Sequence, residues 1–150
     1  MQFNWYILFL TALIPLVVGE IWYSPLLFAN AWMKTTGKTE EELKKGNMPL
    51  IFGLTYLFGI MLSMGMMVMV IHQMHVGSIF ADDKTMADPN SAVSLYVKDF
   101  MTNYGHKCRT FKHGAFHGVL GGFFLALPII AVIALFERRS FKYIAIHVGY

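Results

Sequence analysis

Charged side chains are scarce in this sequence of 150 residues. Asp, Glu, Lys and Arg make up 14% of it, whereas an average soluble domain carries about 25%. With 12 basic and 9 acidic residues, the chain has too few charges to cover the surface of a soluble globule of this size. The deficit argues against a soluble fold and against a disordered chain, and the hydrophobic content of 56% favours a membrane protein.

Cysteine is nearly absent as well. The single cysteine, Cys108, excludes an internal disulfide and any CxxC metal or redox motif. The sequence also lacks the GxSxG, HExxH, GxGxxG and Walker-type motifs that mark common enzyme classes. We therefore expect neither an enzyme nor a bound cofactor. Because no basic stripe with interleaved aromatic residues occurs, we expect no nucleic-acid partner either.

Long apolar segments separate the few charges. A helix needs about 20 apolar residues to cross the hydrocarbon core of a bilayer, and three segments reach this length: residues 3–23, 49–71 and 116–136. A fourth apolar run, residues 141–150, is too short to span, so it is either a surface segment or the start of a fourth helix. The sequence thus predicts an all-α integral membrane helical bundle in a single domain, with three full transmembrane helices plus the start of a fourth.

The segments between these spans predict short interfacial helices. Residues 26–33 resemble a helix that lies in the headgroup region, and Thr39 with Glu42 forms a capping-box pattern for a short helix after it. The only sizeable extramembrane loop covers about residues 72–114. Within it, the apolar spacing predicts an amphipathic helix from Asp88 to about Tyr104.

Lys and Arg residues of the loops indicate an orientation. The first and third loops together carry seven of them and the second carries five. Because cytoplasmic loops are enriched in Lys and Arg, this distribution favours an N-terminus outside the cell. The seven are Lys34, Lys38, Lys44, Lys45, Arg138, Arg139 and Lys142, and the five are Lys84, Lys98, Lys107, Arg109 and Lys112.

Small residues recur every four positions in the third span. A row of this kind lets another helix approach closely, and the partner helix belongs either to this chain or to another subunit. Pro128 interrupts the same span, as Pro15 interrupts the first, where it predicts a kink. The members of this glycine row are Gly114, Gly118, Gly122 and Ala126.

Ionisable groups within or beside the spans are the candidate functional residues. Glu20 near the end of the first span is either a proton or cation site or a carboxylate at headgroup depth, paired with a lysine or a lipid. His113 and His117 are four residues apart on one helix face, and His72 and His75 lie just beyond the second span, on the same side of the membrane. These four histidines are either metal ligands or interfacial side chains bonded to backbone or lipid.

Two stretches carry a family resemblance: WYSPLLFANAWMKTTGKTEEEL and HGAFHGVLGGFFLALPIIAVIALFERRSFKYIAIHVGY. Together they resemble the bacterial membrane family known as domain-of-unknown-function 1761, which has a Gly-x-x-Trp-Tyr-Ser-Pro signature after the first span. The resemblance implies a small four-helix protein of the bacterial cytoplasmic membrane, with a fourth span that this chain only begins, and it implies no particular activity. The signature residues are Gly19, Trp22, Tyr23, Ser24 and Pro25.

Three functions remain open at this point. The first is a non-enzymatic membrane protein that packs through the glycine row, as a homo-oligomer or as an accessory subunit of a membrane complex. The second is a small transporter or conductor of protons or cations that uses Glu20. The third is a membrane protein that binds a metal through His72, His75, His113 and His117.

Overall fold

The computed structural model describes residues 4–150 and, within them, contains helices and no strand. Three helical stretches are long and apolar enough to cross a membrane: Trp5–Trp22, Met48–Val70 and Phe111–Phe136. They confirm the three predicted spans; residue 3, with which the first predicted span begins, lies outside the described residues. The helices are α1 (Trp5–Thr11), α2 (Ile14–Trp22), α3 (Ala29–Thr36), α4 (Glu40–Lys44), α5 (Met48–Val70), α6 (Gln73–Ile79), η1 (Lys84–Ala87), α7 (Ala92–Tyr104), α8 (Phe111–Gly121), η2 (Gly122–Ala126), α9 (Leu127–Phe136) and α10 (Phe141–Gly149).

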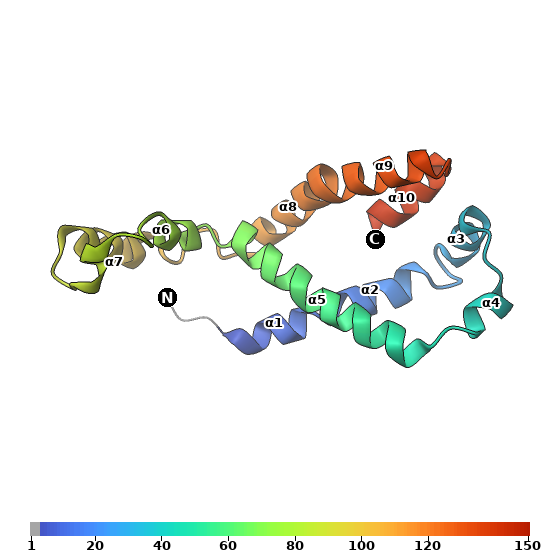
Figure 1. Ribbon diagram of the computed structural model, residues 1–150, viewed down its shortest axis with the longest axis horizontal. Coiled ribbons are helices and arrows are strands. Elements are labelled where there is room, and N and C mark those ends of the chain that lie inside the picture. Colours follow the sequence, from blue (N-terminus) through green and yellow to red (C-terminus); the bar gives the residue numbers. More distant parts are fainter. Residues whose placement is uncertain (1–3) are drawn as a thin grey trace.

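The first span is broken into α1 and α2 at Ala12 and Leu13. Pro15 stands in the first turn of α2, where its missing amide hydrogen costs nothing, because the first amides of a helix have no partner within it. The break therefore confirms the expected effect of Pro15. It also lets α1 and α2 both contact α5 although α5 is a continuous helix (Figure 1).

The first span crosses α5 at Gly59, which has no side chain. A Cβ atom placed on Gly59 would lie 2.5 Å from the carbonyl oxygen of Ala12, so only glycine allows this approach. Ala12 is fully buried there. Hydrogen bonds flank the crossing on both sides: the Thr11 hydroxyl donates to Ser63 Oγ at 3.1 Å, and the Tyr56 hydroxyl donates to the Phe9 carbonyl at 3.3 Å.

The third span runs without interruption from α8 through η2 to α9. It begins at Phe111, five residues before the predicted start at 116, because the Thr110 hydroxyl caps α8 by accepting a hydrogen bond from the His113 amide. The segment η2 is a single π-helical turn directly before Pro128. Such a turn accommodates a residue that has no amide hydrogen to give to the preceding turn.

Helix α10 folds back along α9 after the chain reverses at Arg138, which has φ 54°. In Figure 1 it lies between α9 and the end of α2, and it also contacts α3. Its side chains Ile144 and Ile146 are buried, with 6% and 3% of their surface exposed. The predicted start of a fourth helix is therefore a packed element of the fold.

Helix α10 packs against the residues of the Gly19–Pro25 signature. Trp22 Nε1 donates a hydrogen bond to the Ile146 carbonyl at 3.0 Å, and a Cβ on Gly149 would lie 2.8 Å from the Trp22 ring. A Cβ on Gly19 would lie 3.2 Å from the Tyr150 hydroxyl, which donates to the Pro15 carbonyl at 2.6 Å. Two glycines thus let two large rings fit between the helices.

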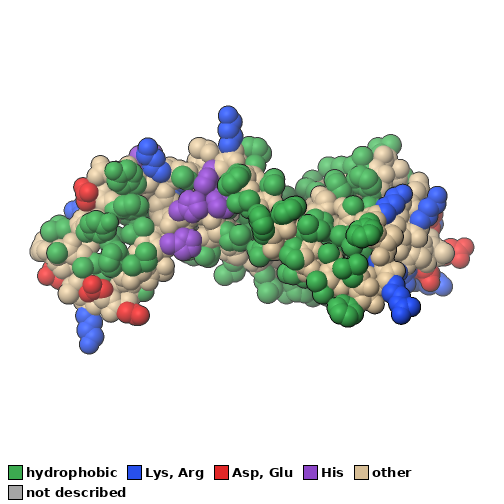
Figure 2. Space-filling model, turned by 90° about the horizontal axis from the view of Figure 1, so that it is seen from above, with side chains coloured by type: hydrophobic (Ala, Val, Ile, Leu, Met, Phe, Trp, Pro, Cys, Tyr) green, Lys and Arg blue, Asp and Glu red, His purple; other side chains and the backbone are tan. Residues whose placement is uncertain are grey.

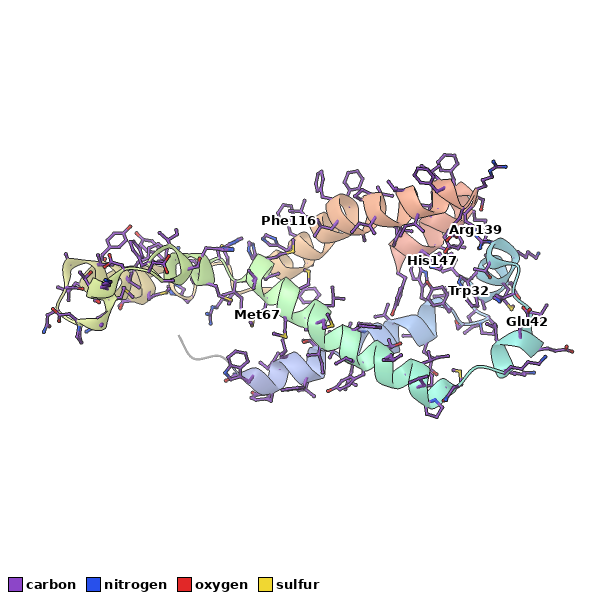
Figure 3. All side chains as sticks on the ribbon, in the orientation of Figure 1. Trp32, Glu42, Met67, Phe116, Arg139 and His147 are labelled. Atoms are coloured by element: carbon purple, nitrogen blue, oxygen red, sulfur yellow. The ribbon has the colours of Figure 1, made fainter. Side chains whose placement is uncertain are left out.

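Tyr23 completes this contact from the signature side. Its hydroxyl shares a hydrogen bond of 3.3 Å with His147 Nδ1, and its ring packs edge-on against Trp32 of α3. Figure 3 shows the side chains of His147 and Trp32 where α10 faces α3.

The segments outside the spans match the predicted short helices with two shifts. The capping box of Thr39 and Glu42 is present at the start of α4, and the interfacial helix predicted over 26–33 is α3, which begins at Ala29. The loop helix, expected to open at Asp88, begins at Ala92 instead. The reason is that the Asp88 carboxylate accepts from the Asn90 amide to form a turn, and Ser91 then caps α7.

We expect the substitution Gly59→Ala to destabilise the protein although alanine favours helices by about 1 kcal/mol over glycine. The added methyl group would collide with the Ala12 carbonyl oxygen and force α5 away from the first span. The matched control is Gly65→Ala in the same helix, where a Cβ meets nothing within 4 Å. Thermal unfolding in detergent should show a lower midpoint for Gly59→Ala and an unchanged or higher one for Gly65→Ala; equal midpoints would contradict the close crossing.

Candidate metal centre

Three of the four predicted histidines come together in the structure. Each of His72, His113 and His117 offers one ring nitrogen, and these three nitrogens lie within 4.8 Å of one another. His113 and His117 are half-buried and His72 is exposed. Figure 2 shows histidine side chains gathered between the apolar surface of the spans and the charged region around α6 and α7. We call this group the histidine triad.

Two local features of the sequence build the triad. Helix α5 ends at Val70, and Ile71 has φ −95° and ψ 83°, which turns the chain so that His72 stands at the start of α6. On the other side, the Thr110 cap fixes the first turn of α8, from which His113 projects. His117 follows one turn later on the same face. The triad therefore joins the end of one span to the start of the next.

The rings of the triad are already close to ligand geometry. His72 Nε2 and His113 Nε2 are 2.9 Å apart, at hydrogen-bond distance, and the three ring centroids are separated by 4.6 to 5.0 Å. Tetrahedral zinc with bonds of about 2.0–2.1 Å holds its nitrogen ligands about 3.3 Å apart. Side-chain rotations that move the nitrogens by about 1 Å would convert the triad into such a set.

The donor set is chemically uniform. Among the described residues, the triad contains imidazoles and neither a carboxylate nor a thiolate. Cys108, although in the adjoining loop, is exposed and stands outside it. Three neutral imidazoles with an open fourth position suit zinc and neighbouring divalent ions, whereas magnesium and calcium prefer oxygen ligands.

Gln73 holds the loop that leads into α8 against the start of α6. It is buried, with 5% of its surface exposed, and its Nε2 donates to the carbonyls of Tyr104 and Lys107 at 3.1 and 2.7 Å. Because Gln73 follows His72 directly, this contact ties the His72 end of α6 to the loop that leads to His113. Sequence reasoning missed Gln73, since a single glutamine at the start of a helix carries no pattern that distinguishes it from a surface residue.

The remaining predicted site residues do not join the triad. His75 is exposed on α6 and stands outside the group. Glu20 is exposed on α2 and makes no hydrogen bond or ion pair with another residue in 4–150, so ion conduction through it stays a prediction. His147 belongs to the α10 contact on the other side of the molecule.

Three glycines of the row have open space beside them. A Cβ on Gly114, Gly118 or Gly122 would meet no atom within 4 Å. Helix α5 contacts α8 and α10 contacts η2, but neither comes that close to these three positions. Ala126, the last member of the row, is the last residue of the π turn η2. Among residues 4–150, no helix therefore packs closely on these three glycines.

We expect Gln73→Leu to loosen the triad without removing a histidine. Leucine has a similar volume but cannot donate to the Tyr104 and Lys107 carbonyls, and leaving buried carbonyls unpaired costs about 1–3 kcal/mol. Hydrogen exchange should become at least tenfold faster in the segment 105–110. Asn103→Ala, which removes exposed hydrogen bonds to Asp99 only, is the control. Unchanged exchange in Gln73→Leu would show that the loop is held by other contacts.

Comparison with known proteins identifies a family but no activity. The family model described as "Protein of unknown function (DUF1761)" matches residues 6–150, a range that includes the signature, the triad and α10. Neither a curated protein nor a solved structure matches the chain. With nearly its whole length matched, the chain belongs to the DUF1761 family.

Proposed function

We propose that this protein binds one divalent transition-metal ion, of which zinc is the type, through the histidine triad at the membrane boundary. The observation that carries the proposal is the convergence of three ring nitrogens within 4.8 Å from two different spans. Two of the three come from one helix face, so the third determines whether a site forms. His72 supplies it because the chain turns at Ile71.

The role proposed is binding and structural, without catalysis. An ion held by His72 on one side and by His113 and His117 on the other would clamp the end of α5 to the start of α8. Binding to the folded state alone stabilises a protein by about 2.7 kcal/mol when the free metal is at 100 times its dissociation constant. Such a clamp would therefore stabilise the junction between α5 and α8.

The proposal includes a location. The loop charges favour an N-terminus outside the cell, and the family resemblance implies the cytoplasmic membrane of a bacterium. With that orientation, the second span ends and the third begins on the outer side, so the triad faces the extracytoplasmic space. An ion could then reach the site without crossing the bilayer.

Cobalt(II) replaces zinc as the probe, because its visible absorption reports ligand number and geometry. Purified protein titrated with Co²⁺ should bind one equivalent and show the intense bands of a tetrahedral site. His113→Ala, His117→Ala and His72→Ala should each weaken binding by more than the roughly 10- to 100-fold that loss of an outer-shell partner costs. His75→Ala and His106→Ala are matched controls that should bind as the unchanged protein does. Equal weakening by a control variant, or absence of tetrahedral bands, would overturn the proposal.

Self-association through the glycine row is the second candidate function. The open space beside Gly114, Gly118 and Gly122 favours it, because a helix of another subunit can approach there without displacing a side chain. The partner is then a second copy of this chain or another membrane subunit.

Native mass spectrometry of the protein released from nanodiscs tests this candidate. We expect a defined oligomer that Gly118→Leu converts to monomer, because leucine would hold the helices apart. Phe116→Trp enlarges an exposed side chain on the opposite face of α8 and should leave the oligomer intact. A monomeric unchanged protein, or equal loss in both variants, would exclude the glycine row as the interface.

A further inference from the structure

A groove separate from the triad runs between the first span and the second half of α5. It has a volume of about 580 Å³ and is lined by both α1 and α5. The apolar part includes Trp5, Leu8, Leu62, Met66 and Met67. Its two hydroxyl groups, on Thr11 and Ser63, are hydrogen-bonded to each other at 3.1 Å. Asn4 and Arg109 are the other polar lining residues, and the rest of the groove offers a ligand only apolar side chains, so the body of that ligand would be apolar.

The length of the groove matches one leaflet of a bilayer. Along α5 it extends from Ile71 at the end of the span to Leu62, nine residues that correspond to about 13 Å of helix. Half of the hydrocarbon core measures about 15 Å. The groove thus begins at the membrane boundary and ends near the bilayer centre, which is the depth that one acyl chain occupies.

One cation stands at the boundary end of the groove. Arg109 is among the lining residues, and it directly precedes Thr110, which caps α8 at the boundary where α5 ends. Arg109 forms no ion pair with any residue in 4–150, where the two ion pairs are Lys44–Glu40 and Arg139–Glu137. No other lining residue is charged. The groove is apolar, has the length of an acyl chain, and opens at a guanidinium group that has no ion-pair partner in 4–150. It is therefore complementary to a lipid that has an apolar tail and an anionic headgroup.

We propose that this groove holds one acyl chain of an anionic phospholipid, whose phosphate is bound by Arg109. The proposal goes beyond metal binding, because the groove contains no histidine and Arg109 is no member of the triad. The lipid fills the space between α1 and α5 on the Ile71 side of their close crossing at Gly59. Met66 and Met67, which line the groove, have flexible side chains that can adapt to an acyl chain.

Native mass spectrometry with added lipid tests the charge recognition. Detergent-purified protein is titrated with phosphatidylglycerol and with phosphatidylcholine that carries identical acyl chains. We expect an affinity about fivefold higher for phosphatidylglycerol, which corresponds to the roughly 1 kcal/mol that one cation contributes near an anionic headgroup. Arg109→Gln should remove this preference. Lys112→Gln removes a neighbouring charge that does not line the groove, and it should keep the preference.

A second pair of variants tests the acyl channel itself and does not depend on Arg109. Met67→Trp fills the groove and should reduce binding of both lipids, whereas Met64→Trp, on the same helix but outside the groove, should not. Equal binding of the two lipids, equal effects of Arg109→Gln and Lys112→Gln, or unimpaired binding by Met67→Trp would each overturn the proposal. Displacement of phosphatidylglycerol by an equimolar amount of oleate would overturn the assignment to a phospholipid. Retention of phosphatidylglycerol would support that assignment.

Discussion

The close crossing of the first span over α5 at Gly59 is the constraint on which the rest of the arrangement depends. Lipid tails are as apolar as leucine, so helices in a membrane associate through close packing and hydrogen bonds rather than through burial from water. Here the backbone of Ala12 lies against Gly59, and the Thr11–Ser63 hydrogen bond fixes the rotation of the two helices about that point. This contact sets the direction in which α5 leaves the first span, and with it the shape of the groove above the crossing and the position at which α5 ends.

The candidate sites lie at that far end because the chain turns there twice. The break at Ile71 and the cap at Thr110 stand where the end of α5 meets the start of α8, and Gln73 binds the connecting loop there. His72 belongs to the triad at this junction, and Arg109 lines the groove. At the opposite end of the molecule, the Gly19–Pro25 signature holds α10 in place through hydrogen bonds of Trp22 and Tyr23.

Patterns that repeat along the chain were predictable, whereas single contacts were not. The charge-free runs predicted three spans, the Thr39–Glu42 spacing predicted a capping box, and the four-residue spacing placed His113 and His117 on one face. The choice between His72 and His75 depends on the backbone turn at Ile71, which no periodicity encodes. Gly59 differs from Gly53 and Gly65 only in what lies opposite, and that is a property of the tertiary structure.

X-ray absorption at the zinc edge of the purified, zinc-loaded protein tests the central claim, that three imidazoles from two spans hold one ion, most directly. The scattering of imidazole rings identifies and counts histidine ligands without depending on affinity. The triad predicts three histidine nitrogens at about 2.0–2.1 Å with one further light-atom ligand. A first shell with fewer than three histidines, or one made of carboxylate and water oxygens, would contradict the account.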